Sequence, residues 1–201
     1  MHPNPRFRWD DRKEIRAFVH EIGFGALFAA TAEGPRVVHV PAVWLGEAVL
    51  GMHLARGNAI TPHLDGATGL FTVIGPHAYV SPDWYGLGPG EVPTWNYVAV
   101  ELEGTLHRMD GDALEAQVDA LSAANEAGLA PKPAWTSAGM DALRREQMLG
   151  AITGFRLDVA EWRGTRKLGQ NKPEAARIAA ADALAAIGDP AMARLMRDAA
   201  G

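Results

Sequence analysis

Residues 96–108 read Asn-Tyr-Val-Ala-Val-Glu-Leu-Glu-Gly-Thr-Leu-His-Arg, and this stretch decides the fold class. Apolar side chains recur along it at every second or fourth position. In an extended chain, side chains two positions apart point to the same face. One face would therefore carry Val98, Val100, Leu102 and Leu106. A strand with one apolar face is typical of an antiparallel sheet, and we predict a strand at 95–109.

Similar short runs occur before and after this segment, separated by turns that contain Gly and Pro. They predict strands at 26–31, 36–44, 47–55, 68–75, 77–81 and 152–163. Gly75 and Pro76 are expected to separate two of them. Strands and turns at this spacing indicate a barrel or a sandwich, not a parallel sheet with helices on both faces.

Helical spacing of apolar residues predicts helices at 11–22, 111–126, 140–150 and 173–187, with a last short helix at 191–199. Asp10 or Asp11 can cap the first helix, and Asp110 or Asp112 the second. The chain is therefore expected to be α+β and mainly antiparallel β. We predict a single domain over 1–201, with an N-terminal helix within 1–22 and C-terminal helices within 173–201.

Composition excludes several classes of protein. The 201 residues are 48% hydrophobic and 21% charged, which is typical of a globular chain. The absence of cysteine excludes disulfides and thiolate metal sites. No apolar run reaches the ~20 residues of a membrane helix, and no signal-peptide pattern is present, so a cytoplasmic protein is expected. The formal charge of −5 argues against a broad nucleic-acid-binding face.

Residues 51–58 combine chemistry that suits a phosphate. A predicted strand ends at Arg56, beside His53, and a helix is expected to start at Asn58. A guanidinium next to a helix N-terminus favours an anion. The alternative is an arginine that caps a surface turn beside a half-buried histidine.

Aromatic residues gather in 75–85 and 92–97, beside Pro and Gly. Rigid aromatic walls of this kind bind flat conjugated ligands. A small core beneath a long loop, or a dimer interface, would use the same residues. The segment 164–172 adds three cations and two amides just before a predicted helix. It suits a phosphate or a polyol, and the alternative is a solvated basic turn.

In this order, the three segments resemble the PaiB family of FMN-binding negative transcriptional regulators. The resemblance rests on His53-Leu54-Ala55-Arg56 with Asn58, on Gly75-Pro76-His77-Ala78-Tyr79-Val80-Ser81-Pro82 with Trp84-Tyr85, on 92–100, and on Lys167-Leu168 with Gln170-Asn171. Two positions depart from the family pattern. Gly169 replaces a serine, and Glu101 replaces a common histidine.

The resemblance implies a split β-barrel, a six-stranded antiparallel Greek key that pairs into a homodimer with FMN in the groove between subunits. It implies a phosphate site at Arg56, a ring edge at Trp84 and Trp95, and a second set of polar contacts, from the partner subunit, at 167–171. The implied cofactor-binding residues are His53, Ala55, Arg56, Asn58, Ser81, Trp84, Thr94, Trp95, Asn96, Lys167, Gln170 and Asn171.

Two classes of function stay open at this point. One is a regulator or flavin-binding module without turnover, and the other is a flavin-dependent oxidoreductase. Haem held by His53 or His77 is a further alternative. Neither a metal site nor a catalytic residue is predicted. Direct DNA binding is doubtful because the terminal helices carry few cations, Arg194 and Arg197 among them.

Overall fold

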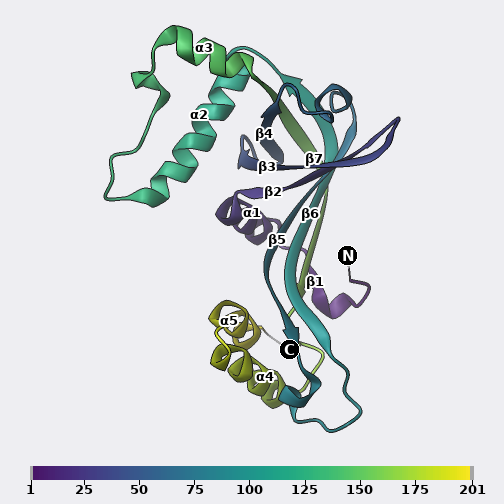
Figure 1. The fold of residues 1–201 in the computed structure, drawn as a ribbon. Coiled ribbons are helices and arrows are strands. Elements are labelled where there is room, and N and C mark those ends of the chain that lie inside the picture. Colours follow the sequence, from purple (N-terminus) through teal and green to yellow (C-terminus); the bar gives the residue numbers. More distant parts are fainter. Residues whose placement is uncertain (1, 200–201) are drawn as a thin grey trace. The chain divides into compact units, whose positions relative to one another are not determined.

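The computed structural model describes residues 2–199, with five α-helices and seven strands among them (Figure 1). The helices are α1 Arg12–Ile22, α2 Asp112–Glu126, α3 Ala142–Gly150, α4 Glu174–Ala186 and α5 Pro190–Asp198. The strands are β1 Arg8–Trp9, β2 Phe24–Thr31, β3 Gly34–Trp44, β4 Val49–Ala55, β5 Thr68–Val80, β6 Thr94–Met109 and β7 Ile152–Lys167. The predicted domain includes Met1 and residues 200–201, which lie outside the described residues.

The strands form one sheet in the order β1-β7-β4-β3-β2-β5-β6. Strand β6 also pairs with β7, so the sheet nearly closes into a ring. The pairs β1–β7, β4–β7, β3–β4, β2–β3 and β2–β5 are all antiparallel. The predicted α+β class, with a mainly antiparallel sheet and C-terminal helices, is confirmed.

The alternation that predicted β6 has a direct structural cause. Its four predicted core side chains are buried, and Leu102 and Leu106 have no exposed surface. Phe155 and Leu157 on β7 are buried in the same way. Removing a leucine or phenylalanine side chain from water contributes about 1.5–3 kcal/mol, so the inner faces of these strands are a main source of stability.

The described chain divides into two compact units. Unit 1 comprises the described parts of 1–15, 74–100 and 163–201, and unit 2 comprises 16–73 and 101–162. Strands β5, β6 and β7 contribute residues to both. The single-domain organisation of 1–201 stays a prediction.

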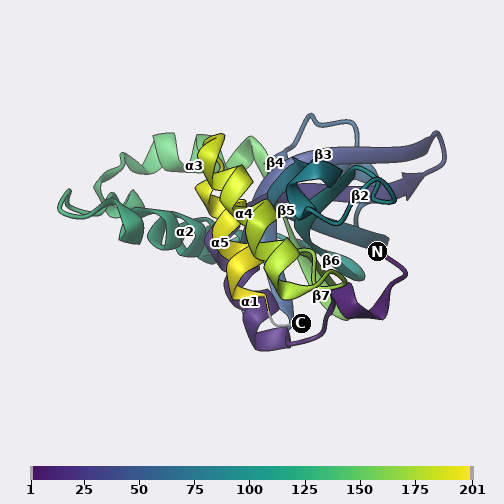
Figure 2. The same ribbon diagram turned by 90° about the horizontal axis from the view of Figure 1, so that it is seen from below.

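In unit 1 the two C-terminal helices lie side by side (Figures 1 and 2). Their contact is made by small and flexible side chains, including Ala180, Leu184 and Met192, which are buried. The Arg177 guanidinium is also buried and donates to the backbone oxygens of Met196 and Arg197. It thereby satisfies carbonyls at the end of α5 that have no partner within the helix.

In unit 2, helix α2 packs against β3 and β4. Its buried positions are Leu114, Gln117 and Leu121, which follow helical spacing. The middle position of this stripe is polar, and the apolar pattern that predicted the helix did not account for it.

The predicted break between two strands at Gly75 and Pro76 is wrong. Strand β5 runs from Thr68 to Val80 without interruption. Its register with β2 covers Gly69–Thr72, so Pro76 lies beyond the part of β5 that bonds β2. There the missing N–H of proline costs no bond to that neighbour, and its fixed φ is compatible with a strand.

Two expectations about helix ends are also wrong. No helix starts at Asn58, because only a single 3-10 turn, Thr61–His63, follows β4. Helix α2 has Gly111 at its N-cap and no side-chain cap, since Asp110 bonds the Arg108 guanidinium instead. By contrast Asp11 does cap α1, accepting from the Glu14 backbone N–H.

Among the described residues, no helix has both the length and the apolar character needed to cross a membrane. The same part of the chain holds no group of three or more His, Asp or Glu side chains placed to bind a metal ion.

Candidate functional site

The residues implied as cofactor ligands fall into both units. Unit 2 contains His53, Ala55, Arg56 and Asn58. Unit 1 contains the other eight, Ser81, Trp84, Thr94, Trp95, Asn96, Lys167, Gln170 and Asn171.

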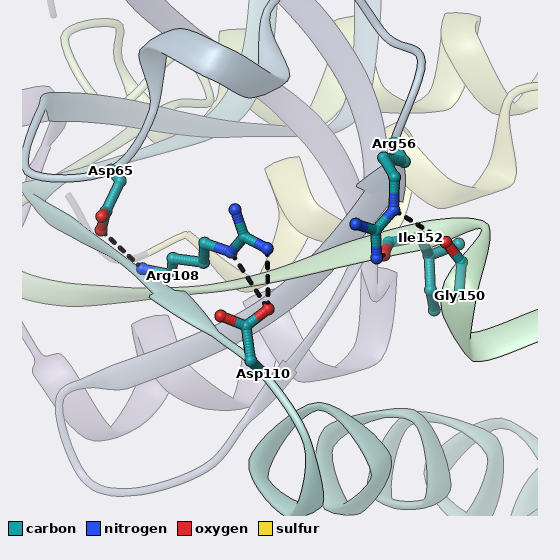
Figure 3. A network of polar contacts seen from close by, with 6 residues as sticks. All are labelled: Arg56, Asp65, Arg108, Asp110, Gly150 and Ile152. Carbon is teal, nitrogen blue, oxygen red and sulfur yellow. Dashed lines mark hydrogen bonds and ion pairs between the residues drawn. The ribbon is translucent and has the colours of Figure 1, made fainter. Parts of the chain in front are cut away.

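Arg56 directly follows β4, and its guanidinium points to the start of β7 (Figure 3). Nε donates to the Gly150 oxygen at 2.7 Å, and Nη2 to the Ile152 oxygen at 3.3 Å. These bonds hold the last carbonyl of α3. They use two of the five N–H donors of the guanidinium, so Arg56 is positioned by the fold and still able to bind an anion.

A hollow of about 470 Å³ lies beside Arg56. Its charged lining consists of Arg56 and Arg145 with Asp110, Asp112, Glu115 and Glu146. Carboxylates outnumber guanidinium groups there, so the hollow disfavours a phosphate. The loop 57–60 follows Arg56 directly.

That loop is held by local bonds. The Asn58 side chain accepts from the Ile60 backbone N–H at 3.2 Å. The Ala55 carbonyl accepts from the Asn58 N–H at 2.9 Å and from the Thr61 hydroxyl at 3.1 Å. Ala55 therefore shapes the loop through its backbone. The Asn58 amide NH₂ bonds no described residue and can donate to a ligand oxygen.

His53 is half-buried, and its Nδ1 lies 3.2 Å from Gln117 Oε1. The Gln117 side chain has no exposed surface, and its Nε2 has no partner within the described chain. Gln117 is not among the site residues implied by the sequence motifs. Its polar type at a core-facing position of α2 was the available indication.

In unit 1, Lys167 ends β7 and its ammonium donates to the Thr94 hydroxyl. No carboxylate of the described residues lies within ion-pair distance of Lys167, and burial lowers the pKa of its ammonium group. A cation partly removed from water without a carboxylate is in an environment that favours an added anion.

The Gln170 side chain makes two hydrogen bonds within its own turn. Its amide accepts from the Leu168 N–H at 2.8 Å and donates to the Arg166 oxygen at 2.7 Å. Both ends therefore hold the turn after β7. Gly169 in this turn has φ +85, a region that favours glycine. Asn171 is exposed.

Lys172 is one of the three cations of the segment 164–172 and is not among the implied cofactor ligands. It forms an ion pair with Glu91, and its Nζ lies 5.3 Å above the Tyr85 ring. Burial raises the pKa of Tyr85, and the nearby Asn96 amide offsets this only in part. The pair connects the long loop before β6 to the turn after β7.

Three rings form an exposed wall in unit 1. Trp95 is 54% exposed, and its ring centroid lies 5.9 Å from that of His77 and 6.3 Å from that of Tyr79. The next residue, Asn96, is buried, and its Nδ2 contacts Met196 Sδ at 3.3 Å. Strand alternation places Trp95 on the opposite face from Thr94 and Asn96.

Ser81 immediately precedes the 3-10 helix Pro82–Tyr85, Trp84 lies within it, and both side chains are half-buried. The Ser81 side chain does not cap that helix, but its carbonyl accepts from the Trp84 N–H at 3.3 Å. The Trp84 ring is not paired with the Trp95 ring, whose described ring contacts are with His77 and Tyr79.

Residues 1–161 match the family described as "Putative FMN-binding domain". The chain belongs to this family. It is also 29% identical to the "Protease synthase and sporulation protein PAI 2" of Bacillus subtilis (strain 168). That similarity spans 175 residues, 84% of this chain and 81% of the relative. The resemblance to the PaiB family is therefore confirmed.

Solved structures with the same fold include proteins from three organisms. The FAD and heme binding protein of Mycobacterium smegmatis has a TM-score of 0.61 at 18% identity and covers 80% of this chain and 73% of its own. A conserved hypothetical protein of Mycobacterium tuberculosis has a TM-score of 0.59 at 14% identity, and the match covers 86% of this chain and 94% of that protein. A flavocytochrome of Azotobacter vinelandii has a TM-score of 0.58 at 15% identity, and the match covers 83% of this chain and 72% of that protein. These likenesses show the fold alone, which is the predicted split barrel.

The donor groups of this member of the FMN-binding domain family fit the two chemical ends of FMN. Lys167 with Thr94, and Arg56 with Asn58, are suited to a phosphate. The exposed Trp95 ring is suited to a flat conjugated system. When bound, FMN would supply hydride and electron transfer at its ring.

Proposed function

We propose that the protein is an FMN-binding split-barrel protein that holds its flavin at a homodimer interface. Arg56 and Asn58 of one subunit, together with the 167–171 turn of the other, would bind the phosphate and ribityl chain. Trp95 would lie against the ring, and Trp84 at its edge. The remaining residues of the implied set, His53, Ala55, Ser81, Thr94 and Asn96, would support these contacts.

The observation that carries the proposal is the environment of Lys167. Its ammonium group is partly buried, contacts a hydroxyl and has no carboxylate partner in the described chain. If Lys167 had only a structural role, we would expect a carboxylate of the same chain to pair with its ammonium group. Lys172, five residues later, is compensated in that way by Glu91.

The test is a titration of the purified protein with FMN and with riboflavin, followed by flavin fluorescence and absorbance. FMN is expected to bind at least about tenfold more tightly, because riboflavin lacks the phosphate that the cations would bond. Equal affinities would show that the phosphate is not recognised. Absence of flavin binding, or a haem spectrum in the purified protein, would overturn the proposal.

Replacing Arg56 by alanine is expected to weaken FMN binding about tenfold to a hundredfold, since a charge-assisted hydrogen bond contributes ~1.5–3 kcal/mol. The change also removes the bonds to Gly150 and Ile152, so thermal unfolding is measured alongside. Arg36→Ala is the control, because Arg36 is a surface arginine that pairs with Glu33. Unchanged affinity in a folded Arg56→Ala variant would place the phosphate elsewhere.

An exposed apolar row on the outer face of the sheet supports the homodimer. Phe28 of β2 lies in register with Val37 of β3 on one side and with Leu70 of β5 on the other. Phe28 is 40% exposed and Val37 47%. Exposed apolar patches of this kind commonly form interfaces, and a symmetric pair is the usual assembly.

Light scattering is expected to give twice the 21.5 kDa chain mass for the wild type. Phe28→Glu should reduce it to the mass of one chain, because two buried glutamates would meet at a symmetric interface without partners. Leu143→Glu, at an exposed apolar position of α3, should leave it unchanged. A monomeric wild type would refute the homodimer.

The proposal favours a flavin-binding module related to the PaiB regulators over direct DNA recognition. Arg194 and Arg197 pair with Asp198 and Asp182, and Arg177 is buried. The terminal helices therefore present little uncompensated positive charge for phosphate contacts. A flavin-dependent oxidoreductase is the second candidate function. It too requires FMN binding, so the same titration is its first test.

A further inference from the structure

Helices α2 and α3, with the segment that joins them, form a helical hairpin in unit 2 (Figure 1). A cavity of about 190 Å³ lies between this hairpin and the end of β4. Its apolar lining consists of Val118, Trp135, Met140, Met148, Leu149 and Ile152. None of these residues is among those implied to bind FMN.

The cavity has the size and lining of a small-ligand site. An apolar cavity of about 150 Å³ can hold a benzene molecule, so 190 Å³ admits one six-membered ring with a short side chain. Trp135 and Met148 are each about half exposed, so the ring would cover apolar surface that otherwise faces water. The volume is too small for a flavin nucleotide, since sites for larger ligands span about 300–1,000 Å³.

A polar pair lies at one side of this cavity. His53 lines it, and Gln117 Oε1 accepts from the His53 Nδ1–H. With its proton on Nδ1, the imidazole keeps Nε2 as an acceptor. A ligand N–H could therefore be bound at His53.

Keeping Gln117 buried is costly for the fold. Its Nε2 has no partner in the described chain, and an unpaired buried amide destabilises a protein because it has lost its hydrogen bonds to water. Gly51 makes the necessary room, because a Cβ there would lie 2.9 Å from Gln117 Cγ. An arrangement that sacrifices stability to hold a histidine beside a cavity is typical of binding sites.

The charges around the cavity favour a cation. Glu115 and Asp119 line it together with Arg145, which pairs with both. The hollow beside Arg56 shares Glu115, Arg145 and Leu149 with the cavity and adds Asp110, Asp112 and Glu146. The cavity and the hollow together therefore contain five carboxylates and two guanidinium groups, those of Arg56 and Arg145. Arg108 neutralises one of the carboxylates, Asp110 (Figure 3). The carboxylates still outnumber the guanidinium groups.

We propose that this cavity binds a small organic cation that carries one ring on a short chain, such as an arylalkylamine. The ring would lie among Val118, Trp135 and Met148. The ammonium group would donate to His53 Nε2 and to the carboxylates of Glu115 and Asp119, displacing part of their pairing with Arg145. Among the residues that line the cavity, His53 alone also belongs to the set proposed to support the flavin site, and binding of the amine does not require FMN.

The experiment compares three probes of similar shape and different charge, which are 2-phenylethylamine, 2-phenylethanol and 3-phenylpropionate. Each is titrated into the full-length protein and followed by calorimetry and by the Trp135 indole N–H resonance, assigned with Trp135→Phe. The amine is expected to bind saturably and shift this resonance. The acid should bind at least about tenfold more weakly, because carboxylates repel it.

A matched pair of variants locates the binding. Val118→Phe adds a ring inside the cavity and should abolish binding of 2-phenylethylamine. Ala116→Phe adds the same ring on the exposed face of α2 and should leave binding intact. The resonance measurement on the wild type decides the matter if Val118→Phe does not fold.

Three results would overturn the inference. The first is the absence of a Trp135 shift with any amount of amine up to its solubility. The second is equal or tighter binding of 3-phenylpropionate, which would mean that Arg56 or Arg145 dominates the site. The third is amine binding that survives in a folded Val118→Phe variant, which would place it elsewhere.

Discussion

Gly104→Ala is expected to destabilise the fold strongly, although it adds only one methyl group. A Cβ at this position of β6 would lie 2.0 Å from the Asp158 carbonyl oxygen and 3.0 Å from Val159 Cα, both backbone atoms of β7. No side-chain rotation relieves such a contact, so the two strands would have to separate. Overpacking of a core costs ~1–3 kcal/mol and occasionally more, and this contact falls at or above the upper end.

Urea unfolding followed by circular dichroism measures the effect. Gly128→Ala is the matched control in the same unit, since nothing lies within 4 Å of its added methyl group and its φ is not positive. It should unfold at or slightly above the wild-type midpoint, because alanine restricts the unfolded chain. Similar midpoints for Gly104→Ala and the wild type would show that β6 and β7 do not approach as closely as described.

Much of the sheet could be predicted because strand alternation reflects burial directly. Val98, Val100 and Leu102 repeat with period two, and the sheet buries that face. The continuity of β5 could not be predicted in this way. Whether proline interrupts a strand depends on which neighbour its missing N–H would have bonded, and a single sequence does not contain that information.

The candidate site was predicted less completely than the fold. The motifs identified residue types that suit FMN, but they did not reveal which partners each side chain already has. Gln170 is bonded at both ends within its own turn, whereas Lys167 has no carboxylate partner among the described residues. Such differences depend on distances of a few ångströms between segments far apart in the chain, such as Glu91 and Lys172.

The partly buried ammonium of Lys167 leads to the second large effect. Lys167→Met is expected to weaken FMN binding about tenfold to a hundredfold, because a hydrogen bond to a charged group contributes ~1.5–3 kcal/mol. Lys167→Arg should retain most of the affinity, and Lys13→Met should retain all of it. Lys13 is an exposed residue of α1, so that variant controls for the loss of one positive charge.

The stability of the flavin-free protein distinguishes a binding role from a structural one. Burial lowers the pKa of Lys167, so the unfolded chain binds this proton more tightly than the folded chain. At a pH where the lysine is charged, it therefore lowers the free energy of unfolding. This destabilisation decreases as the pH rises and the lysine loses its proton. Lys167→Met should consequently leave the melting temperature of the flavin-free protein unchanged or raise it. A lower melting temperature would assign Lys167 to the fold instead.

The same lowered pKa predicts how FMN binding depends on pH. The phosphate is attracted to the ammonium form, so affinity should fall as the pH rises and Lys167 loses its proton. The decline should begin at a lower pH than for an ordinary lysine, since burial already favours the neutral amine. In Lys167→Arg it should disappear, because a guanidinium stays charged throughout this range. Titrations from neutral to alkaline pH would measure both curves, and a parallel decline in the two proteins would show that another group binds the phosphate.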